Sequence, residues 1–244
     1  GWSDAREGQY GRQLAAAGFT VLAVDSFGPR GIGGTAEDQT KLGVTDQARD
    51  AFAARKYLVS VGAAPERLAV MGFSRGAMVA LRAADRTWLP SETERFALAI
   101  PFYPGCSARV RQPRPAASIF MALGEKDDYT GVKPCQELAA NYAAAGGKIT
   151  VKVYPDASHG FDGNPAYNKA YRLATIENYS DCVVMIEPDG RQSYGGQVLP
   201  AEDPGIFDLL RKGCMKKGAT MWVNARQKEI ATQDVIQFLD ANFR

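Results

Sequence analysis

The sequence predicts an α/β fold with a mostly parallel sheet and helices on both of its faces. Short apolar runs rich in β-branched residues alternate with segments of helical periodicity, which is typical of βαβ units. The runs FTVLAV and ALAIPFY lack alternating polar residues, as expected for strands buried on both faces. With 244 residues, 45% hydrophobic and 23% charged, we expect a single domain over residues 1–244.

The first half of the chain alternates helix and strand signals. The helices are marked by apolar residues at helical spacing, by Ser3 or Thr45 as N-caps and by glycines after the last turn. The strands are continuous apolar runs bounded by polar or glycine-rich segments. In chain order these signals predict a helix over 4–17, a strand over 19–24, a helix over 45–61, a strand over 68–73 and a helix over 75–85.

The second half repeats this alternation until residue 165. The expected elements are a strand over 97–103, a strand over 118–124, a helix over 134–145, a strand over 149–155 and a final helix over 226–241. Residues 165–224 show a weaker pattern, and we interpret them as an irregular insertion before the final helix. Within this insertion, Asp189-Gly190 predicts a hairpin turn.

Charge and composition argue against several classes of function. The 29 basic and 27 acidic residues leave a net charge of +2, and the basic residues are scattered, so no nucleic-acid partner is expected. No apolar run approaches the roughly 18 residues that a membrane-spanning helix needs, so no membrane span is expected. The chain has one histidine and no CxxC pair, so no metal site is expected.

The four cysteines are candidates for disulfides. The pairs nearest in sequence are Cys106 with Cys135 and Cys182 with Cys214, although the sequence leaves the connectivity open. Either bond would close a loop of about 30 residues and stabilise an unstrained fold by roughly 3–4 kcal/mol in the chain-entropy model. The alternative is four free thiols in a cytoplasmic protein.

The stretch GFSRG, residues 72–76, is the first candidate for catalytic chemistry. It lies where an expected strand becomes an expected helix, which is the context of a nucleophile elbow. The tight turn leads us to expect that neither flanking glycine tolerates a side chain. The turn would lift the Ser74 hydroxyl over the start of the helix, where the Arg75 backbone N–H can stabilise an oxyanion. The alternative is a tight turn with a capping serine.

Two later strand ends supply partners for Ser74. His159 follows the expected strand over 149–155, and histidine changes protonation near neutral pH, which suits a general base. Asp127 and Asp128 follow the strand over 118–124, and either could orient the imidazole; we favour Asp127. Because the carboxyl ends of parallel strands meet at one edge of a sheet, these side chains are expected to come together. Their order, Ser then Asp then His, distinguishes this arrangement from that of chymotrypsin or subtilisin.

These motifs resemble the dienelactone hydrolase family of the α/β-hydrolase fold. The matching stretches cover roughly residues 1–165 and the closing helix; they are VDSFGPRG (24–31), GFSRG (72–76), FYPG (102–105), GEKDD (124–128) and YPDASHGFDG (154–163). The resemblance places the family's acid on Asp127. Founding members carry a cysteine nucleophile where this chain has Ser74, which favours a general serine esterase.

The resemblance also implies features outside the catalytic motifs. The insertion with Cys182 and Cys214 is similar to that of larger exported relatives, so we expect disulfides and a periplasmic or secreted protein, with the cytoplasm as the alternative. The family has strands before the first helix, one of them between the strands at 19–24 and 68–73. We therefore expect about 40–60 further N-terminal residues, from typical strand and loop lengths, with Gly1 as a remnant of the loop that donates the second oxyanion N–H.

The expected reaction is hydrolysis of a small carboxylic ester or lactone through an acyl-enzyme, without a cofactor. Arg30 could pair with a substrate carboxylate, and the aromatic side chains of Trp2, Tyr103 and Phe161 could line an acyl pocket. The Arg75 side chain is expected at the surface or along the side of its helix. The alternatives are a peptidase or acyltransferase with the same three residues, or a hydrolase-like binding protein without activity.

Overall fold

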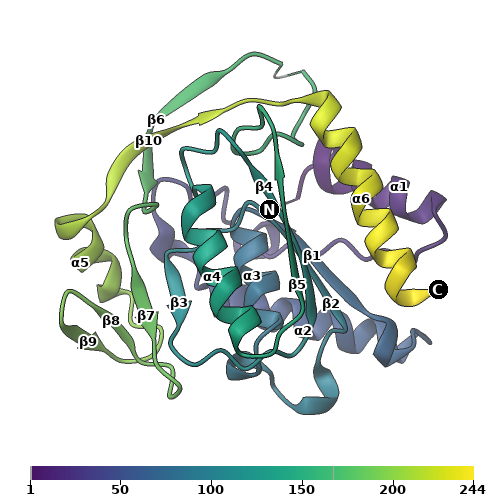
Figure 1. Ribbon diagram of the computed structural model, residues 1–244, viewed down its shortest axis with the longest axis horizontal. Helices are drawn as coiled ribbons and strands as arrows, with labels where there is room; N and C mark the ends of the chain where they lie inside the picture. The colour runs from purple at the N-terminus through teal and green to yellow at the C-terminus, as the bar shows by residue number, and fades with distance from the viewer. Residues whose placement is uncertain (1, 167) are drawn as a thin grey trace.

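A parallel sheet lies at the centre of the computed structural model, which describes residues 2–166 and 168–244. Within these residues the strand order is β1-β2-β4-β5, and each neighbouring pair is parallel (Figure 1). The strands span β1 Ala69–Phe73, β2 Leu98–Phe102, β4 Ser118–Gly124 and β5 Ile149–Tyr154. The sequence prediction of a mostly parallel α/β sheet is confirmed, and the chain has an α/β-hydrolase-like fold.

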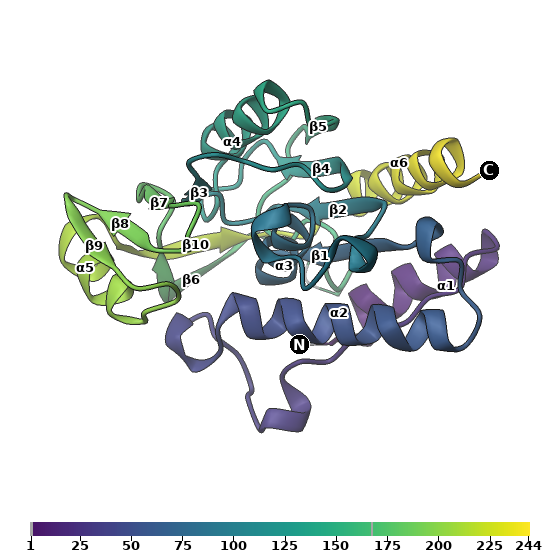
Figure 2. The same cartoon turned by 90° about the horizontal axis from the view of Figure 1, so that it is seen from below.

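Helices cover both faces of this sheet (Figures 1 and 2). The first and last helices pack with Ile100, Phe102 and Phe120 on one face, while two middle helices pack with Ile119 and Met121 on the other. The bounds of these helices are α1 Gln9–Ala16, α2 Val44–Ser60, α3 Arg75–Ala83, α4 Val132–Ala144 and α6 Ala225–Phe243. Helix α2 packs against α3 rather than directly against the sheet. Side chains of successive residues in β2 and β4 thus point to opposite faces of the sheet, as expected for a pleated strand.

Shorter helical turns connect these elements. A π-helical turn over Asp4–Gly8 precedes α1, and 3₁₀ turns span Gly28–Arg30, Gln39–Lys41, Pro65–Arg67, Arg86–Trp88 and Glu92–Glu94. Neither Ser3 nor Thr45 caps a helix with its side chain, so both N-cap predictions are wrong. The Ser3 hydroxyl and backbone N–H both donate to Glu7 at 2.9 Å, and α2 begins one residue before Thr45, whose hydroxyl accepts a hydrogen bond from Arg82 instead.

Residues 165–224 are more regular than the sequence suggested. They contain β6 Tyr171–Asn178, β7 Val184–Ile186, β8 Gln192–Tyr194, β9 Gln197–Leu199, α5 Gly205–Gly213 and β10 Lys216–Met221. A small sheet forms in the order β3-β7-β8-β9, where β3 is Ala108–Val110. The predicted Asp189-Gly190 hairpin is confirmed, because β7 and β8 pair antiparallel and Gly190 has a φ of 85°. β6 and β10 pair separately as an antiparallel ribbon, called here the β6–β10 ribbon.

Disulfides join the two cysteine pairs that are nearest in sequence. Cys106 is bonded to Cys135, which fastens the segment after β2 to α4. Cys182 is bonded to Cys214, which closes the end of the β6–β10 ribbon where Asn178 pairs with Lys216.

The prediction of a doubly buried strand over 19–24 is wrong. In the described chain, residues 20–24 make no backbone–backbone hydrogen bonds, and Val21, Leu22 and Val24 are 42%, 39% and 44% exposed. The physical reason is the lack of a pairing partner, because a strand forms only where neighbouring backbone groups pair with it. A cleft of about 820 Å³ separates this segment from β1 and is lined by both. The cleft occupies the position where the resemblance placed a further strand.

Helix α2 contributes to two surroundings. Ala48 and Phe52 are buried against α3. Ala51 and Leu58 are partly buried against the same cluster and also line the cleft. In the last helix, α6, Ala231, Val235 and Leu239 are buried.

Removal of the ribbon disulfide should destabilise the protein. We expect the Cys182→Ser/Cys214→Ser variant to lose roughly 3–4 kcal/mol of unfolding free energy, because a sequence separation of 32 leaves the unfolded chain with more conformational freedom. Urea unfolding of both forms measures this loss. The Cys106→Ser/Cys135→Ser variant, with a separation of 29, should lose a similar amount. An unchanged midpoint in the first variant would contradict the prediction.

Candidate active site

Ser74 lies between β1 and α3 in an unusual backbone conformation. Its φ of 52° and ψ of −112° fall in a region that non-glycine residues rarely adopt. Hydrogen bonds hold the turn on both sides: the Ser74 N–H donates to the Phe102 carbonyl at 2.9 Å, and its own carbonyl accepts from Ala77 at 3.0 Å and Met78 at 3.2 Å. Hydrogen bonds to the neighbouring strand and to the first turn of α3 therefore hold Ser74 in this strained conformation.

The two glycines around Ser74 have different roles. A β-carbon on Gly72 would lie 2.1 Å from the Gly76 carbonyl oxygen, so only glycine fits there. A β-carbon on Gly76 would meet no atom of the described residues within 4 Å. The expectation that both glycines are sterically required is therefore wrong for Gly76, because its side-chain position faces the cleft.

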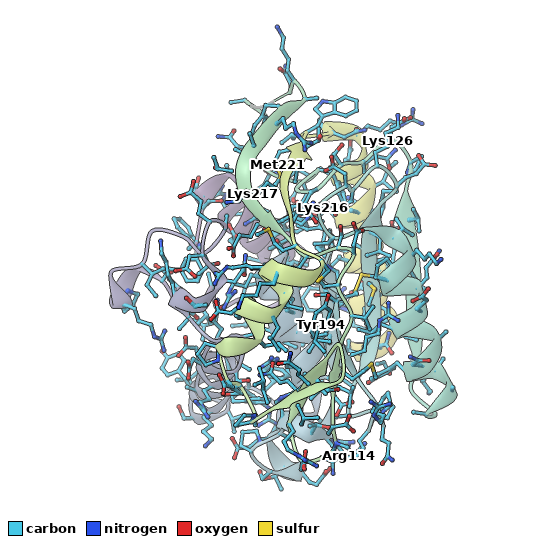
Figure 3. The ribbon with its side chains drawn as sticks, turned by 90° about the vertical axis from the view of Figure 1, so that its left-hand side faces the viewer. Arg114, Lys126, Tyr194, Lys216, Lys217 and Met221 are labelled. Carbon is cyan, nitrogen blue, oxygen red and sulfur yellow. A yellow bond between two sulfur atoms is a disulfide. The ribbon has the colours of Figure 1, made fainter. Side chains whose placement is uncertain are left out.

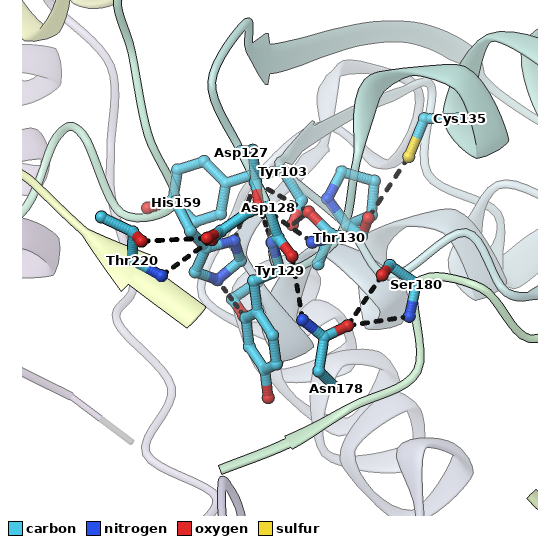
Figure 4. A network of polar contacts seen from close by, with 12 residues as sticks. Tyr103, Asp127, Asp128, Tyr129, Thr130, Cys135, His159, Asn178, Ser180 and Thr220 are labelled. Atoms are coloured by element: carbon cyan, nitrogen blue, oxygen red, sulfur yellow. Dashed lines mark hydrogen bonds and ion pairs between the residues drawn. The ribbon is translucent and has the colours of Figure 1, made fainter. Parts of the chain in front are cut away.

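The structure brings Ser74, His159 and Asp127 into one chain of hydrogen bonds. Figure 4 shows His159 and Asp127 side by side. His159 Nε2 lies 2.9 Å from Ser74 Oγ, and His159 Nδ1 lies 2.8 Å from Asp127 Oδ2. A carboxylate only accepts hydrogen bonds. The proton of the neutral imidazole is therefore placed on Nδ1, and Nε2 is left free to accept from the serine hydroxyl.

Asp127 is held by its own loop. Its Oδ1 accepts the backbone N–H groups of Tyr129 at 2.8 Å and Thr130 at 2.9 Å, and its Oδ2 accepts the Thr130 hydroxyl at 2.8 Å. Burial raises the pKa of this carboxyl, but the charge and hydrogen bond of His159, together with Thr130, outweigh burial and bring the pKa below its ordinary value. Asp127 is therefore ionised at neutral pH.

Asp128 points away from His159. Its two carboxylate oxygens accept the backbone N–H of Thr220 at 2.7 Å and the Thr220 hydroxyl at 2.9 Å. Of the two adjacent aspartates, the one next to His159 is therefore Asp127, and Asp128 binds β10 instead (Figure 4).

The predicted substrate contacts are only partly placed at the cleft. Trp2 lines it, as do Ser74, Arg75 and His159. Arg30 instead forms a bidentate ion pair with Asp50, with distances of 2.7 and 2.9 Å. Tyr103 and Phe161 are fully buried in the core and lie outside the cleft lining. Gly1 lies outside the described residues.

Tyr129 is a site residue that the sequence did not single out. It lines the cleft and packs edge-on against His159, with ring centroids 4.7 Å apart. Its position directly after the acid motif was a usable signal, because a residue that follows the acid in the same loop stays close to the histidine.

The Arg75 side chain is half-buried at the cleft, where polar partners hold it. It donates to Gln47 and Gln39, both at 2.6 Å. Burial, followed by the charge of Arg82, lowers its pKa to about 10. The guanidinium is held inward because these two glutamine side chains offer it acceptors there.

Asp162 and Tyr103 form a buried pair beneath His159, and the sequence did not mark Asp162. The Tyr103 hydroxyl donates to Asp162 Oδ1, and the Tyr103 ring packs edge-on against His159 at 4.7 Å. The other oxygen, Oδ2, has no hydrogen-bond partner among the described residues. Burial raises the pKa of Asp162 above its ordinary value, despite the nearby charge of Arg6.

The described residues contain neither a metal-binding cluster nor a membrane-spanning helix. Within residues 2–166 and 168–244, no group of three or more His, Cys, Asp or Glu side chains is arranged to hold a metal ion. Over the same residues, no helix is both long enough and apolar enough to cross a bilayer.

A family model described as the dienelactone hydrolase family matches residues 5–183. The chain belongs to the dienelactone hydrolase family. The resemblance identified in the motifs is thus confirmed, and the family match extends into the segment interpreted as an insertion. No curated protein matches the sequence.

Several solved structures are similar to this member of the dienelactone hydrolase family. A putative dienelactone hydrolase from Klebsiella pneumoniae is 19% identical, with a TM-score of 0.42 over 51% of this chain and 53% of that one. Thermogutta terrifontis esterase 2 is 18% identical, with a TM-score of 0.43 over 51% and 59%. A variant of SOBER1 from Arabidopsis thaliana is 18% identical, with a TM-score of 0.39 over 48% and 56%. The alignments thus span little more than half the length of these structures.

The buried Asp162 carboxyl should make stability depend on pH. Its folded-state pKa is raised, so the folded protein keeps this proton at pH values where the unfolded chain has lost it, and stability falls as pH rises above the ordinary value of 3.8. The Asp162→Asn variant lacks this loss. We expect the unfolding free energy of the natural protein, relative to the variant, to decrease from about pH 4 upward.

Urea unfolding at several pH values tests this expectation. A difference between the two proteins that stays constant with pH would contradict it.

Proposed function

We propose that this protein is a serine hydrolase that cleaves carboxylic esters or lactones through an acyl-enzyme. Membership of the dienelactone hydrolase family supports a hydrolase of the ester or lactone type. The observation that carries the proposal is the hydrogen-bonded series from Asp127 through His159 to Ser74 at a strained strand-to-helix turn. This geometry fits nucleophilic catalysis by an activated serine.

In the proposed first step, Ser74 Oγ attacks the carbonyl carbon of the substrate while His159 Nε2 takes the hydroxyl proton. Asp127 stabilises the imidazolium that forms, because its carboxylate is bound to Nδ1 and held ionised by its loop. The Arg75 N–H is among the first amide groups of α3, which have no partner within the helix. It would donate to the oxyanion, and the positive end of the helix dipole adds to its effect.

The second step returns the enzyme to its starting state. His159 gives its proton to the leaving alkoxide, which departs as an alcohol and leaves an ester on Ser74. A water molecule then loses a proton to His159 and attacks this ester, and the acid product leaves as the proton returns to Ser74.

The cleft gives the substrate an approach to Ser74. Tyr129 and Met221 line it next to His159, and the Trp2 ring also contributes to its lining. We propose that apolar groups of a small ester or lactone bind against these side chains, because burial of apolar surface would supply the binding energy. The roles of Arg30, Tyr103 and Phe161 as substrate contacts are not part of this proposal.

The two disulfides support an oxidising compartment for the folded protein. We propose that it acts in the periplasm or outside the cell.

Loss of the Ser74 hydroxyl should abolish hydrolysis. We expect Ser74→Ala to lower kcat for 4-nitrophenyl acetate by roughly 1000-fold or more, because the nucleophile is gone while the fold is retained. Reaction with a fluorophosphonate should label the natural protein at Ser74 and leave this variant unlabelled.

Ser60→Ala is the matched control, since Ser60 is an exposed serine whose hydroxyl donates to the Tyr57 carbonyl at the end of α2. It should keep both activity and labelling. Undiminished hydrolysis by Ser74→Ala would refute the role of this serine, and an unreactive natural protein would favour a binding function.

A further inference from the structure

The β6–β10 ribbon reaches the candidate active site from outside the central sheet. Its strands pair antiparallel from Asn178 with Lys216 at one end to Tyr171 with Met221 at the other. Figure 1 shows the ribbon arching past the central sheet, and Figure 3 shows Lys216, Lys217 and Met221 in order along β10. Its Met221 end therefore lies at the site, while the disulfide between Cys182 and Cys214 closes the other end.

Both strands of the ribbon bind the loop between β4 and α4, residues 125–131, called here the acid loop, and they bind it at Asp128. From β10, Thr220 donates its backbone N–H and its hydroxyl to the two carboxylate oxygens, at 2.7 and 2.9 Å. From β6, Asn178 Nδ2 donates to the Asp128 carbonyl at 2.9 Å, and Arg172 lies 3.6 Å from the carboxylate. The hydrogen bonds to the Asp128 side chain thus come from β10, and the hydrogen bond to its backbone carbonyl comes from β6 (Figure 4).

Asn178 is itself held rigidly. It is 1% exposed, and its amide also donates to the Gly218 carbonyl at 3.0 Å, while its oxygen accepts the Ser180 N–H at 3.0 Å and hydroxyl at 2.8 Å. A buried amide with both donors and its acceptor in use has one favourable orientation. Its contact with Asp128 therefore fixes the position of the loop.

The Met221 end of the ribbon binds the loop after β5, residues 155–163, called here the histidine loop. Met221, directly after Thr220, forms a parallel β-bridge with His159. Slightly further along the chain, the Asn224 N–H donates to the Phe161 carbonyl at 2.8 Å. The start of the acid loop is attached to the histidine loop directly, through Glu125 to Tyr154 and Lys126 to Ala157. The ribbon supplies the attachment for the part of the acid loop that follows.

We propose that the β6–β10 ribbon clamps the acid and histidine loops together, with Asp128 as the positioning residue. The contacts form a closed circuit from His159 to Asp127, through the chain to Asp128, across to Thr220, through the chain to Met221 and back to His159. Asp128 touches no reacting atom, so it acts through the placement of Asp127. This inference rests on the proposed hydrolase function.

A clamp of this kind should matter for turnover more than for substrate binding. A misplacement of about 1 Å in a catalytic group can cost on the order of 100-fold in rate. We expect Asp128→Ala to lower kcat for 4-nitrophenyl acetate by roughly 10- to 100-fold, with KM changed by less than about 3-fold. The rate of Ser74 labelling by a fluorophosphonate should fall in parallel.

Two further variants separate positioning from general stability. Asp128→Asn keeps an oxygen that can accept the Thr220 N–H, so it should recover most of the lost kcat. Asp189→Ala is the matched control, because Asp189 is an exposed aspartate that also binds a backbone N–H and a side-chain donor, both from Arg191, at 3.1 and 2.7 Å. It should keep the natural kcat.

The outcomes distinguish the clamp from the hydrolase function. Natural kcat in Asp128→Ala, or equal losses in Asp128→Ala and Asp128→Asn, would overturn the clamp while leaving the hydrolase intact. If the natural protein neither hydrolyses the ester nor reacts with the fluorophosphonate, the proposed function itself fails.

Thermal unfolding of each variant accompanies the kinetics. If Asp128→Ala is unfolded at the assay temperature, Thr220→Val replaces it, since this change removes only the hydroxyl bond to Asp128 and keeps the backbone N–H bond. A roughly 3-fold or greater loss of kcat then supports the clamp, and an unchanged kcat overturns it.

Discussion

The close approach of β1 to the first turn of α3 is the contact on which the site depends. It exists because Gly72 has no side chain where the Gly76 carbonyl passes. With that approach, Ser74 is forced into its strained conformation and its N–H and C=O find partners on the neighbouring strand and helix. The same geometry leaves the Arg75 N–H at the start of a helix, beside the serine hydroxyl. The absence of a side chain on Gly72 thus fixes the positions of both the proposed nucleophile and the proposed oxyanion donor.

The parallel sheet then sets where the partners of Ser74 can lie. The acid and histidine loops follow β4 and β5, whose ends meet at the same edge as the end of β1. Gly124 allows these loops to touch, since a β-carbon there would lie 2.5 Å from the Ala157 carbonyl. Burial would disfavour an ionised Asp127, and the donors around it reverse that effect. The lowered pKa of Asp127 therefore depends on the close backbone packing that brings His159 next to it.

The sequence predicted features that depend on neighbours along the chain. Ser74, Asp127 and His159 each follow an apolar strand, so their convergence followed from the parallel topology alone. Features that depend on distant partners were missed or misplaced. The run at 19–24 has strand composition, but no backbone among the described residues pairs with residues 20–24. Tyr103 was expected to line a pocket, but its hydroxyl binds the buried Asp162. The attachment of Asp128 to Thr220 joins residues separated by 92 positions, and no local pattern marks it.

The cleft beside β1 links strand pairing to substrate access. Within the described residues, β1 is the last strand of the central sheet on that side, and residues 19–24 line the same cleft. A strand edge beside apolar surface favours pairing with another strand, and the resemblance to relatives places a further strand at this position. Because β1 ends directly before Ser74, a strand that pairs with β1 would lie next to the serine and form one wall of the approach to it.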